Sequence, residues 1–97
     1  MGVYRLSPRA ARDVDRIYEY SITQFGFDVA YDYLTRLYQA LEALADHPQM
    51  GRDYGHLRRA LRRFEHESHS IFYRTSDDQI LIVRVLGRGQ LPSRHLR

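Results

Sequence analysis

The sequence contains no cysteine, and this absence excludes three kinds of chemistry. Without a thiol the chain forms no disulfide, offers no thiolate nucleophile and holds no metal through sulfur. A protein built in this way is compatible with a reducing compartment. Its stability must therefore come from an ordinary hydrophobic core.

Lysine is also absent, so all 15 basic residues are arginine. This excludes a Schiff-base lysine, a P-loop lysine and a lysine general acid. The arginines are unevenly placed: residues 1–48 hold five against seven acidic residues, whereas residues 49–97 hold ten against five. We expect an anionic partner to meet the second half of the chain.

Long apolar runs are missing as well, since no segment approaches the roughly 20 residues that span a bilayer. The N-terminus also lacks the pattern of a signal peptide, and no low-complexity tract suggests disorder. A chain of 97 residues suits one domain with a modest core. We expect a single cytoplasmic domain over residues 1–97 that has no membrane contact and needs no cofactor.

The first half of the chain has the apolar spacing of two helices. Ser7 is placed as an N-cap and Pro8 as the first helical residue of a helix over 8–25, which Gly26 ends. Asp28 is placed to cap a second helix, whose apolar residues recur every 3.5 positions until the chain reaches Pro48. The short link "GFD" predicts an antiparallel helical hairpin.

The remaining segments read as strands. Residues 3–7 alternate in polarity, and the segments 58–68, 69–75 and 79–86 are rich in aromatic and β-branched residues. The last two flank the turn "SDD", which predicts a three-stranded antiparallel meander. Because residues 80–86 are apolar on both faces, we expect that strand to be central, with the first strand beside it. The predicted fold class is α+β, in the order β-α-α-β-β-β, with an antiparallel sheet packed against a helical hairpin.

These segments, in this order, resemble the ParE branch of the RelE/ParE toxin superfamily. The resemblance covers nearly the whole chain and rests on "YRLSPRAARDVDRIYEYSITQFG", "HPQMGRDYG", "IFYR" before an acidic turn, "ILIVRVL" after it and the tail "PSRHL". It implies a toxin of a type II toxin–antitoxin pair, neutralised by a ParD-like antitoxin with a ribbon-helix-helix DNA-binding domain. It further implies DNA gyrase as the target, whereas the RelE branch cleaves mRNA at the ribosome.

Catalysis by this chain would need a base, a proton donor and cations around a phosphate. Arginines 62, 63, 74 and 84 could supply the cations, and Glu65 could act as a base. The RelE branch takes its acid and base from lysine, glutamate, histidine and tyrosine near the sheet and the C-terminus. Here Gly87 stands where related sequences often have histidine, although His95 or His69 could substitute. We therefore assign no catalytic residue and predict a toxin that binds, with a RelE-like mRNA endonuclease as the alternative.

Arg74 and Arg84 interrupt the apolar pattern of two strands, and the turn between these strands decides their relation. A three-residue turn would place both side chains on one face, as a shared cationic site for a carboxylate of the antitoxin or an anionic group of the target. A two-residue turn would separate them and let each pair with an acid such as Glu65 or Glu67. We favour the shared site.

Other features have simpler interpretations. Asp13, Asp15 and Glu19 resemble the solvated face of a helix, paired with nearby arginines. His66 and His69 would face opposite sides of one strand, so we predict no metal site.

Alternation also divides the arginines of residues 58–63 between two faces, which argues against binding of duplex DNA or reading of its sequence. Tyr20 and Tyr33 fall off the apolar stripes of the helices, and exposed tyrosines are common at protein interfaces. The residues predicted to bind the antitoxin or the target are Arg62, Arg63, Arg74, Arg84, Arg88, Tyr20 and Tyr33.

Overall fold

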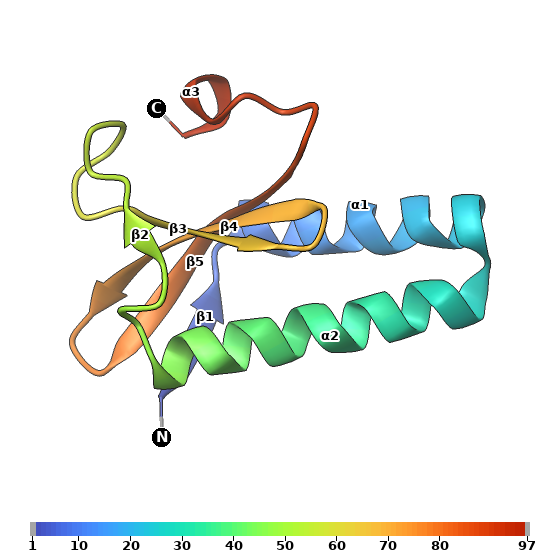
Figure 1. Ribbon diagram of the computed structural model, residues 1–97, viewed down its shortest axis with the longest axis horizontal. Coiled ribbons are helices and arrows are strands. Elements are labelled where there is room, and N and C mark those ends of the chain that lie inside the picture. The colour runs from blue at the N-terminus through green and yellow to red at the C-terminus, as the bar shows by residue number, and fades with distance from the viewer. Residues whose placement is uncertain (1, 97) are drawn as a thin grey trace.

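The computed structural model describes residues 2–96 and shows two long helices packed against a five-stranded sheet (Figure 1). Along the chain the elements are β1 (Val3–Leu6), α1 (Pro8–Phe25), α2 (Phe27–Asp46), β2 (Arg52–Asp53), β3 (Arg62–His66), β4 (His69–Ser76), β5 (Gln79–Gly87) and α3 (Pro92–His95). The predicted α+β class and the helical hairpin are confirmed. Within the described residues, no helix is both long and apolar enough to cross a membrane.

The ends of the first helix follow the sequence closely. Ser7 is the N-cap of α1, and its hydroxyl oxygen accepts a hydrogen bond from the backbone N–H of Ala10. Gly26 ends α1 with a φ of 87°, a left-handed conformation that glycine adopts without a steric penalty. Gly26 is also the residue before α2, so the prediction that Asp28 caps this helix was wrong. Gly26, with its positive φ, is the only residue between the two helices, and Asp28 already lies in the first turn of α2.

The strand order of the sheet is β1-β5-β4-β3-β2, so β5 is internal and β1 pairs beside it, as predicted. The prediction of a wholly antiparallel sheet was wrong for one pair, because β1 runs parallel to β5. A parallel pair requires a long connection, and the hairpin and the other strands provide it here.

The predicted strand over 58–68 is shorter in the structure. Residues 54–61 form a looped segment in which Ala60 has a φ of 64°, and this conformation interrupts an extended backbone. The strand β3 begins only at Arg62, and β2, which we did not predict, pairs with it at the edge of the sheet.

Both faces of the sheet are covered. The helices pack on one face through a buried cluster that includes Leu37, Leu41, Ile71 and Tyr73. On the other face a second buried cluster contains Leu61, Phe72, Val83, Leu86 and Leu96, the last of which follows α3. The C-terminal segment therefore closes the face opposite the helical hairpin (Figure 1).

The helical hairpin extends past the end of the sheet, and its connecting end is left without a covering layer (Figure 1). Ile22 and Phe25 continue the apolar spacing of α1 in the sequence, but Ile22 is 37% exposed and Phe25 is 64% exposed. The spacing of the stripe was right. The core is absent at this end because the sheet does not reach it.

Candidate functional site

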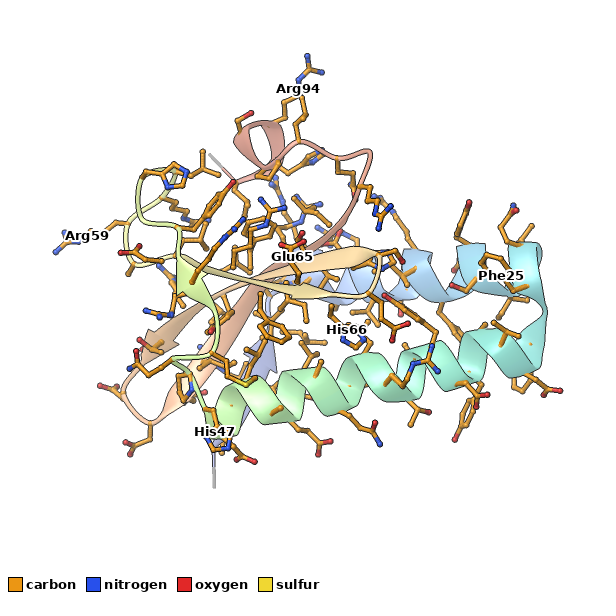
Figure 2. The ribbon with its side chains drawn as sticks, viewed as in Figure 1. Phe25, His47, Arg59, Glu65, His66 and Arg94 are labelled. Atoms are coloured by element: carbon orange, nitrogen blue, oxygen red, sulfur yellow. The ribbon has the colours of Figure 1, made fainter. Side chains whose placement is uncertain are left out.

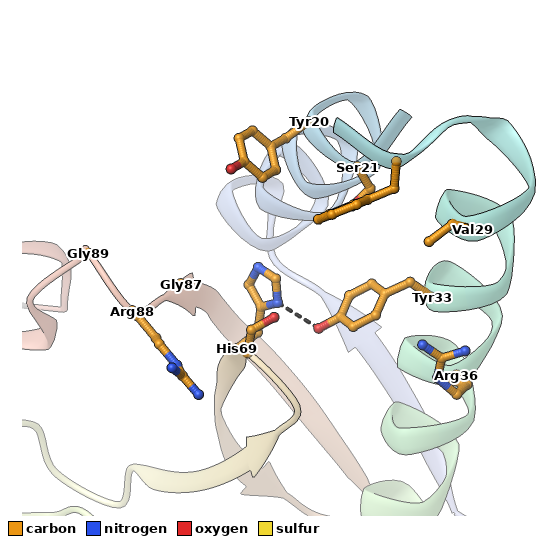
Figure 3. Close-up of a pocket in the computed structure, with 11 residues that line it drawn as sticks. Tyr20, Ser21, Val29, Tyr33, Arg36, His69, Gly87, Arg88 and Gly89 are labelled. Carbon is orange, nitrogen blue, oxygen red and sulfur yellow. Dashed lines mark hydrogen bonds between the residues drawn. The ribbon is translucent and has the colours of Figure 1, made fainter. Parts of the chain in front are cut away.

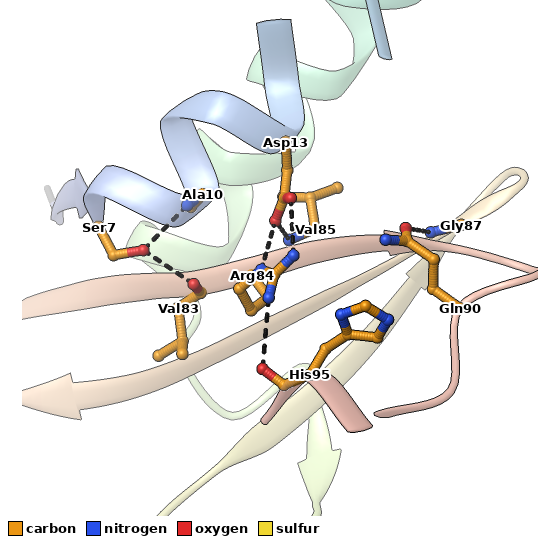
Figure 4. Close-up of polar contacts among 9 residues, drawn as sticks. All are labelled: Ser7, Ala10, Asp13, Val83, Arg84, Val85, Gly87, Gln90 and His95. Atoms are coloured by element: carbon orange, nitrogen blue, oxygen red, sulfur yellow. Dashed lines mark hydrogen bonds and ion pairs between the residues drawn. The ribbon is translucent and has the colours of Figure 1, made fainter. Parts of the chain in front are cut away.

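Arg84 forms a buried ion pair with Asp13 of α1 (Figure 4). Its Nε and one terminal nitrogen donate to the two carboxylate oxygens at 2.8 and 3.0 Å, and the backbone N–H of Val85 donates to the same carboxylate at 2.9 Å. The residues are 7% and 5% exposed, respectively. The hydrogen bond with Asp13 raises the pKa of the Arg84 guanidinium, which is charged at every physiological pH.

This pair corrects two predictions. Asp13 does not belong to the solvated face of α1, because it is buried against β5. Arg84 has its carboxylate partner within this chain, so it is not a free site for an antitoxin carboxylate. Helical spacing alone placed Asp13 among surface acids, because it cannot show which strand the helix covers.

The turn between β4 and β5 contains the two residues Asp77 and Asp78, since Ser76 pairs with Gln79. Further along, Phe72 pairs with Arg84 and Tyr73 with Ile82, which leaves Val83 as an extra residue in β5. This bulge changes the facing that a regular hairpin would impose. Arg74 and Arg84 therefore line one depression despite the short turn, and neither Glu65 nor Glu67 pairs with them.

The depression has a volume of about 440 Å³ and lies between the start of α1, the sheet and α3. Its lining contains the five arginines Arg9, Arg12, Arg58, Arg74 and Arg84, together with His95. We call it the arginine depression. Among the described residues, only Arg84 of these arginines has a carboxylate within salt-bridge distance.

Arg62 and Arg63 lie on different faces of β3, as alternation predicted, and each has partners within the chain. Arg62 donates from Nε to the carbonyl of Gly51 at 2.9 Å, which holds the segment before β2. Arg63 donates from Nε to Glu65 at 2.6 Å, and Ser70 donates its hydroxyl to the same carboxylate. Burial opposes ionisation of Glu65, but the hydrogen bonds from Arg63 and Ser70 outweigh it and lower its pKa.

Three of the predicted partner-binding residues lie around one groove (Figure 3). The groove has a volume of about 410 Å³ and separates the connecting end of the helical hairpin from the β3–β4 turn and the segment after β5. Its principal lining residues are Tyr20, Phe25, Val29, Tyr33, His69 and Arg88. We call it the aromatic groove. Sequence reasoning found Tyr20, Tyr33 and Arg88 but missed His69, which comes to the groove through pairing of β4 with β3.

His66 and His69 sit opposite each other across the tight β3–β4 turn, so the prediction that they face opposite sides was wrong. Glu67 has a φ of 52°, and the reversal of the chain there places both rings against Tyr33. The hydroxyl of Tyr33 and Nδ1 of His69 are 2.6 Å apart and form a hydrogen bond. In residues 2–96 the structure shows no group of three metal-binding side chains.

The two histidines should make stability depend on pH. Burial lowers the pKa of both rings from 6.5, and repulsion from His66 lowers that of His69 further. Because the folded protein binds protons less well than the unfolded chain, we expect full stability above pH 6.5 and a loss as the pH falls below it. The measurement is the urea midpoint at pH values from about 7.5 to about 5.5, above the range where Glu67 and Glu65 titrate.

The double variant His66→Gln/His69→Gln should have a flatter profile over this range, and His56→Gln, an exposed site in the loop before β3, serves as the matched control. An equal flattening by His56→Gln would contradict the assignment.

The four arginines that we considered as cations for RNA cleavage do not meet. Arg74 and Arg84 line the arginine depression, and Arg63 lines a separate depression with Glu65 and Ser70. Arg62 is engaged by backbone carbonyls. His95 does lie beside Arg74 and Arg84, but Glu65, the candidate base, does not line that depression. The candidate acid, base and cations are thus distributed over several places.

Comparison with known proteins gives a consistent result. Residues 4–92 match the family model described as the ParE toxin of a type II toxin–antitoxin system, parDE. Toxin ParE1 of Caulobacter vibrioides is 40% identical over 96 residues, 99% of each chain. Toxin ParE1 of Mycobacterium tuberculosis is 34% identical over 94 residues, 96% of each chain.

Two solved structures share the fold. The chromosomal ParDE toxin–antitoxin system from P. aeruginosa gives a TM-score of 0.77 at 20% identity, over 90% of this chain and 96% of that one. The RelBE2 toxin–antitoxin complex from Mycobacterium tuberculosis gives 0.65 at 19% identity, over 90% of this chain and 98% of that one. At these identities the likeness concerns the fold alone.

Proposed function

This chain belongs to the ParE toxin family of type II toxin–antitoxin systems, and on that premise we propose that it arrests growth by binding DNA gyrase. In the proposal it acts in the cytoplasm, without catalysis, and is neutralised by a ParD-like antitoxin with a ribbon-helix-helix domain. The antitoxin occupies the aromatic groove, whose lining includes Tyr20, Phe25 and Val29.

The observation that carries this proposal is the uncovered apolar end of the hairpin. Six large apolar side chains between residues 20 and 31 are exposed, namely Tyr20, Ile22, Phe25, Phe27, Val29 and Tyr31. A concentration of exposed apolar surface of this kind marks a protein-binding surface. The aromatic groove lies beside it, with Arg36 and Arg88 on its rim to orient an acidic partner.

The arrangement of charges supports binding without chemistry. Arg84 is already neutralised by Asp13, and Arg62 and Arg63 hold parts of the sheet and its edge in place. A phosphorane needs cations converging on one point, together with a base and an acid. Glu65 shares a depression with Arg63 and Arg88, but no histidine or tyrosine lines it to donate a proton, and the free arginines of the arginine depression lie elsewhere.

One observation favours a second candidate function, a RelE-like mRNA endonuclease. His69 and Tyr33 form a hydrogen-bonded pair in a groove that also contains Arg36 and Arg88. Burial lowers the pKa of His69, so the ring is neutral at physiological pH and able to accept a proton. The apolar lining from Tyr20, Phe25 and Val29 suits a peptide better than a ribonucleotide, which makes this the weaker candidate.

Controlled expression without the antitoxin tests the function. We expect growth arrest, inhibition of supercoiling by purified gyrase and accumulation of cleaved DNA. The same protein is incubated with ribosomes and mRNA. Codon-positioned cuts that His69→Ala abolishes would replace the gyrase proposal by the nuclease. Arg84→Ala is unsuitable here, since loss of the Asp13 pair would disturb folding whichever function is right. Normal growth on expression would indicate a chain that binds its antitoxin without toxicity.

A further inference from the structure

Four arginines that line the arginine depression form no ion pair among the described residues. Arg9 and Arg12 come from the first turns of α1, Arg58 from the loop before β3 and Arg74 from β4. All four are exposed, and none has a carboxylate partner among the described residues. Clefts lined by one sign of charge concentrate ions of the opposite sign. The depression therefore has the charge of an anion-binding site.

The side chain of Arg84, which also lines the depression, is held in a fixed position. Its guanidinium is held by both oxygens of Asp13, and a further nitrogen donates to the backbone carbonyl of His95 at 3.3 Å (Figure 4). The hydroxyl of Ser7 donates to the carbonyl of Val83 at 2.8 Å, so the start of α1 is tied to the bulge in β5. These contacts therefore hold the start of α1, which carries Arg9 and Arg12, against β5 before any ligand arrives.

We propose that the arginine depression binds the phosphodiester backbone of a nucleic acid, without reading its sequence. This contact goes beyond the binding of antitoxin and gyrase proposed above and involves a different part of the surface. An acidic protein segment is the competing occupant. Protein segments, however, derive their affinity mainly from apolar and aromatic anchors.

The lining of the depression favours phosphates over such a segment. Its apolar side chains are few, chiefly Leu81 and Val83, and the exposed aromatic side chains lie at the connecting end of the hairpin. Planar guanidinium groups bind phosphate oxygens in a bidentate way. Sequence-independent binding of nucleic acids arises almost entirely from such neutralised phosphates. Arg62 and Arg63 lie on different faces of β3 and so do not form a continuous row of contacts to the phosphates of duplex DNA. The arginine depression does not depend on such a row, because α1, β4, β5 and α3 all contribute to its lining.

Fluorescence anisotropy on the purified chain, free of antitoxin and gyrase, tests the proposal. The probes are labelled oligonucleotides of about 12 units, as single-stranded DNA, single-stranded RNA and duplex DNA of one sequence. If four free arginines neutralise four phosphates, the logarithm of the binding constant should fall with the logarithm of salt with a slope of about −3.6 for duplex and about −2.8 for single strands. The three probes separate DNA from RNA as the source of the phosphates.

The chain offers a matched pair of variants at neighbouring positions. Arg58 lines the depression, whereas Arg59 is exposed and points away from the molecule (Figure 2). Arg58→Gln should weaken binding about five- to tenfold near 0.1 M salt and reduce the slope by about one contact. Arg59→Gln changes the net charge by the same amount and should leave the binding constant and the salt slope nearly unchanged. Arg74→Gln should behave as Arg58→Gln does.

Equal losses of oligonucleotide affinity for Arg58→Gln and Arg59→Gln would overturn the proposal, because binding would then depend on the net charge of the protein and not on the arginine depression. It would also fail if a polyglutamate peptide bound in an Arg58-dependent way while the oligonucleotides did not, and the occupant would then be an acidic protein segment. The assay contains neither antitoxin nor gyrase, so these outcomes are independent of the proposed function. The arginines changed are exposed, and unaltered urea midpoints of the variants show that the fold is intact.

Discussion

Replacing Asp13 by alanine should lower the free energy of unfolding by about 3–5 kcal/mol, because it leaves the Arg84 guanidinium charged and buried without a partner. The backbone N–H of Val85 loses its acceptor at the same time. Domains of this size are stable by roughly 5–15 kcal/mol, so this loss is a large share of the total stability and should move the urea midpoint to a much lower concentration. Urea denaturation followed by circular dichroism measures the effect.

Two controls isolate the ion pair. Asp15→Ala removes an acid from the exposed side of the same helix and should change stability by no more than about 0.5 kcal/mol. The double variant Asp13→Leu/Arg84→Met removes both charges together and should recover much of the loss, because no uncompensated charge remains. Equal stabilities for the Asp13→Ala and Asp15→Ala variants would contradict the structural role assigned here.

The sequence predicted the fold well because local signals and global packing agree over most of the chain. Ser7 and Gly26 mark the ends of α1, and the residues before Pro48 end α2. The apolar pattern of β5 reports burial on both faces and therefore an internal strand. These signals concern positions close together in the chain, which periodicity and capping describe directly.

The site was harder to predict because it depends on contacts between distant residues. The pairing of Asp13 with Arg84 spans 71 positions and passes through a bulge at Val83 that has no marker in the sequence. His66 and His69 meet because the backbone reverses at Glu67, a residue that seldom adopts a positive φ. The exposure of Phe25 depends on where the sheet ends, which the apolar period of a helix does not reveal.

Replacing Phe25 by aspartate should weaken binding of the antitoxin by about 30-fold or more, because a charge would stand in the apolar lining of the aromatic groove. Phe25 is 64% exposed at the connecting end of the hairpin (Figure 2), so the substitution should leave the urea midpoint almost unchanged. The antitoxin is taken from the reading frame adjacent to the toxin, and calorimetric titration gives the affinity. In cells, co-expressed antitoxin should then fail to restore growth.

Phe27 provides the matched control for this prediction. It is 61% exposed and only two positions away, but it stacks on Tyr31 with ring centroids 6.2 Å apart and does not line the groove. Phe27→Asp introduces the same charge beside the same turn, and we expect an effect of less than about threefold, as for most residues outside a hot spot. If both variants lose affinity equally, the antitoxin covers the whole apolar end of the hairpin. If neither loses affinity, it binds elsewhere, and the aromatic groove must serve a different partner.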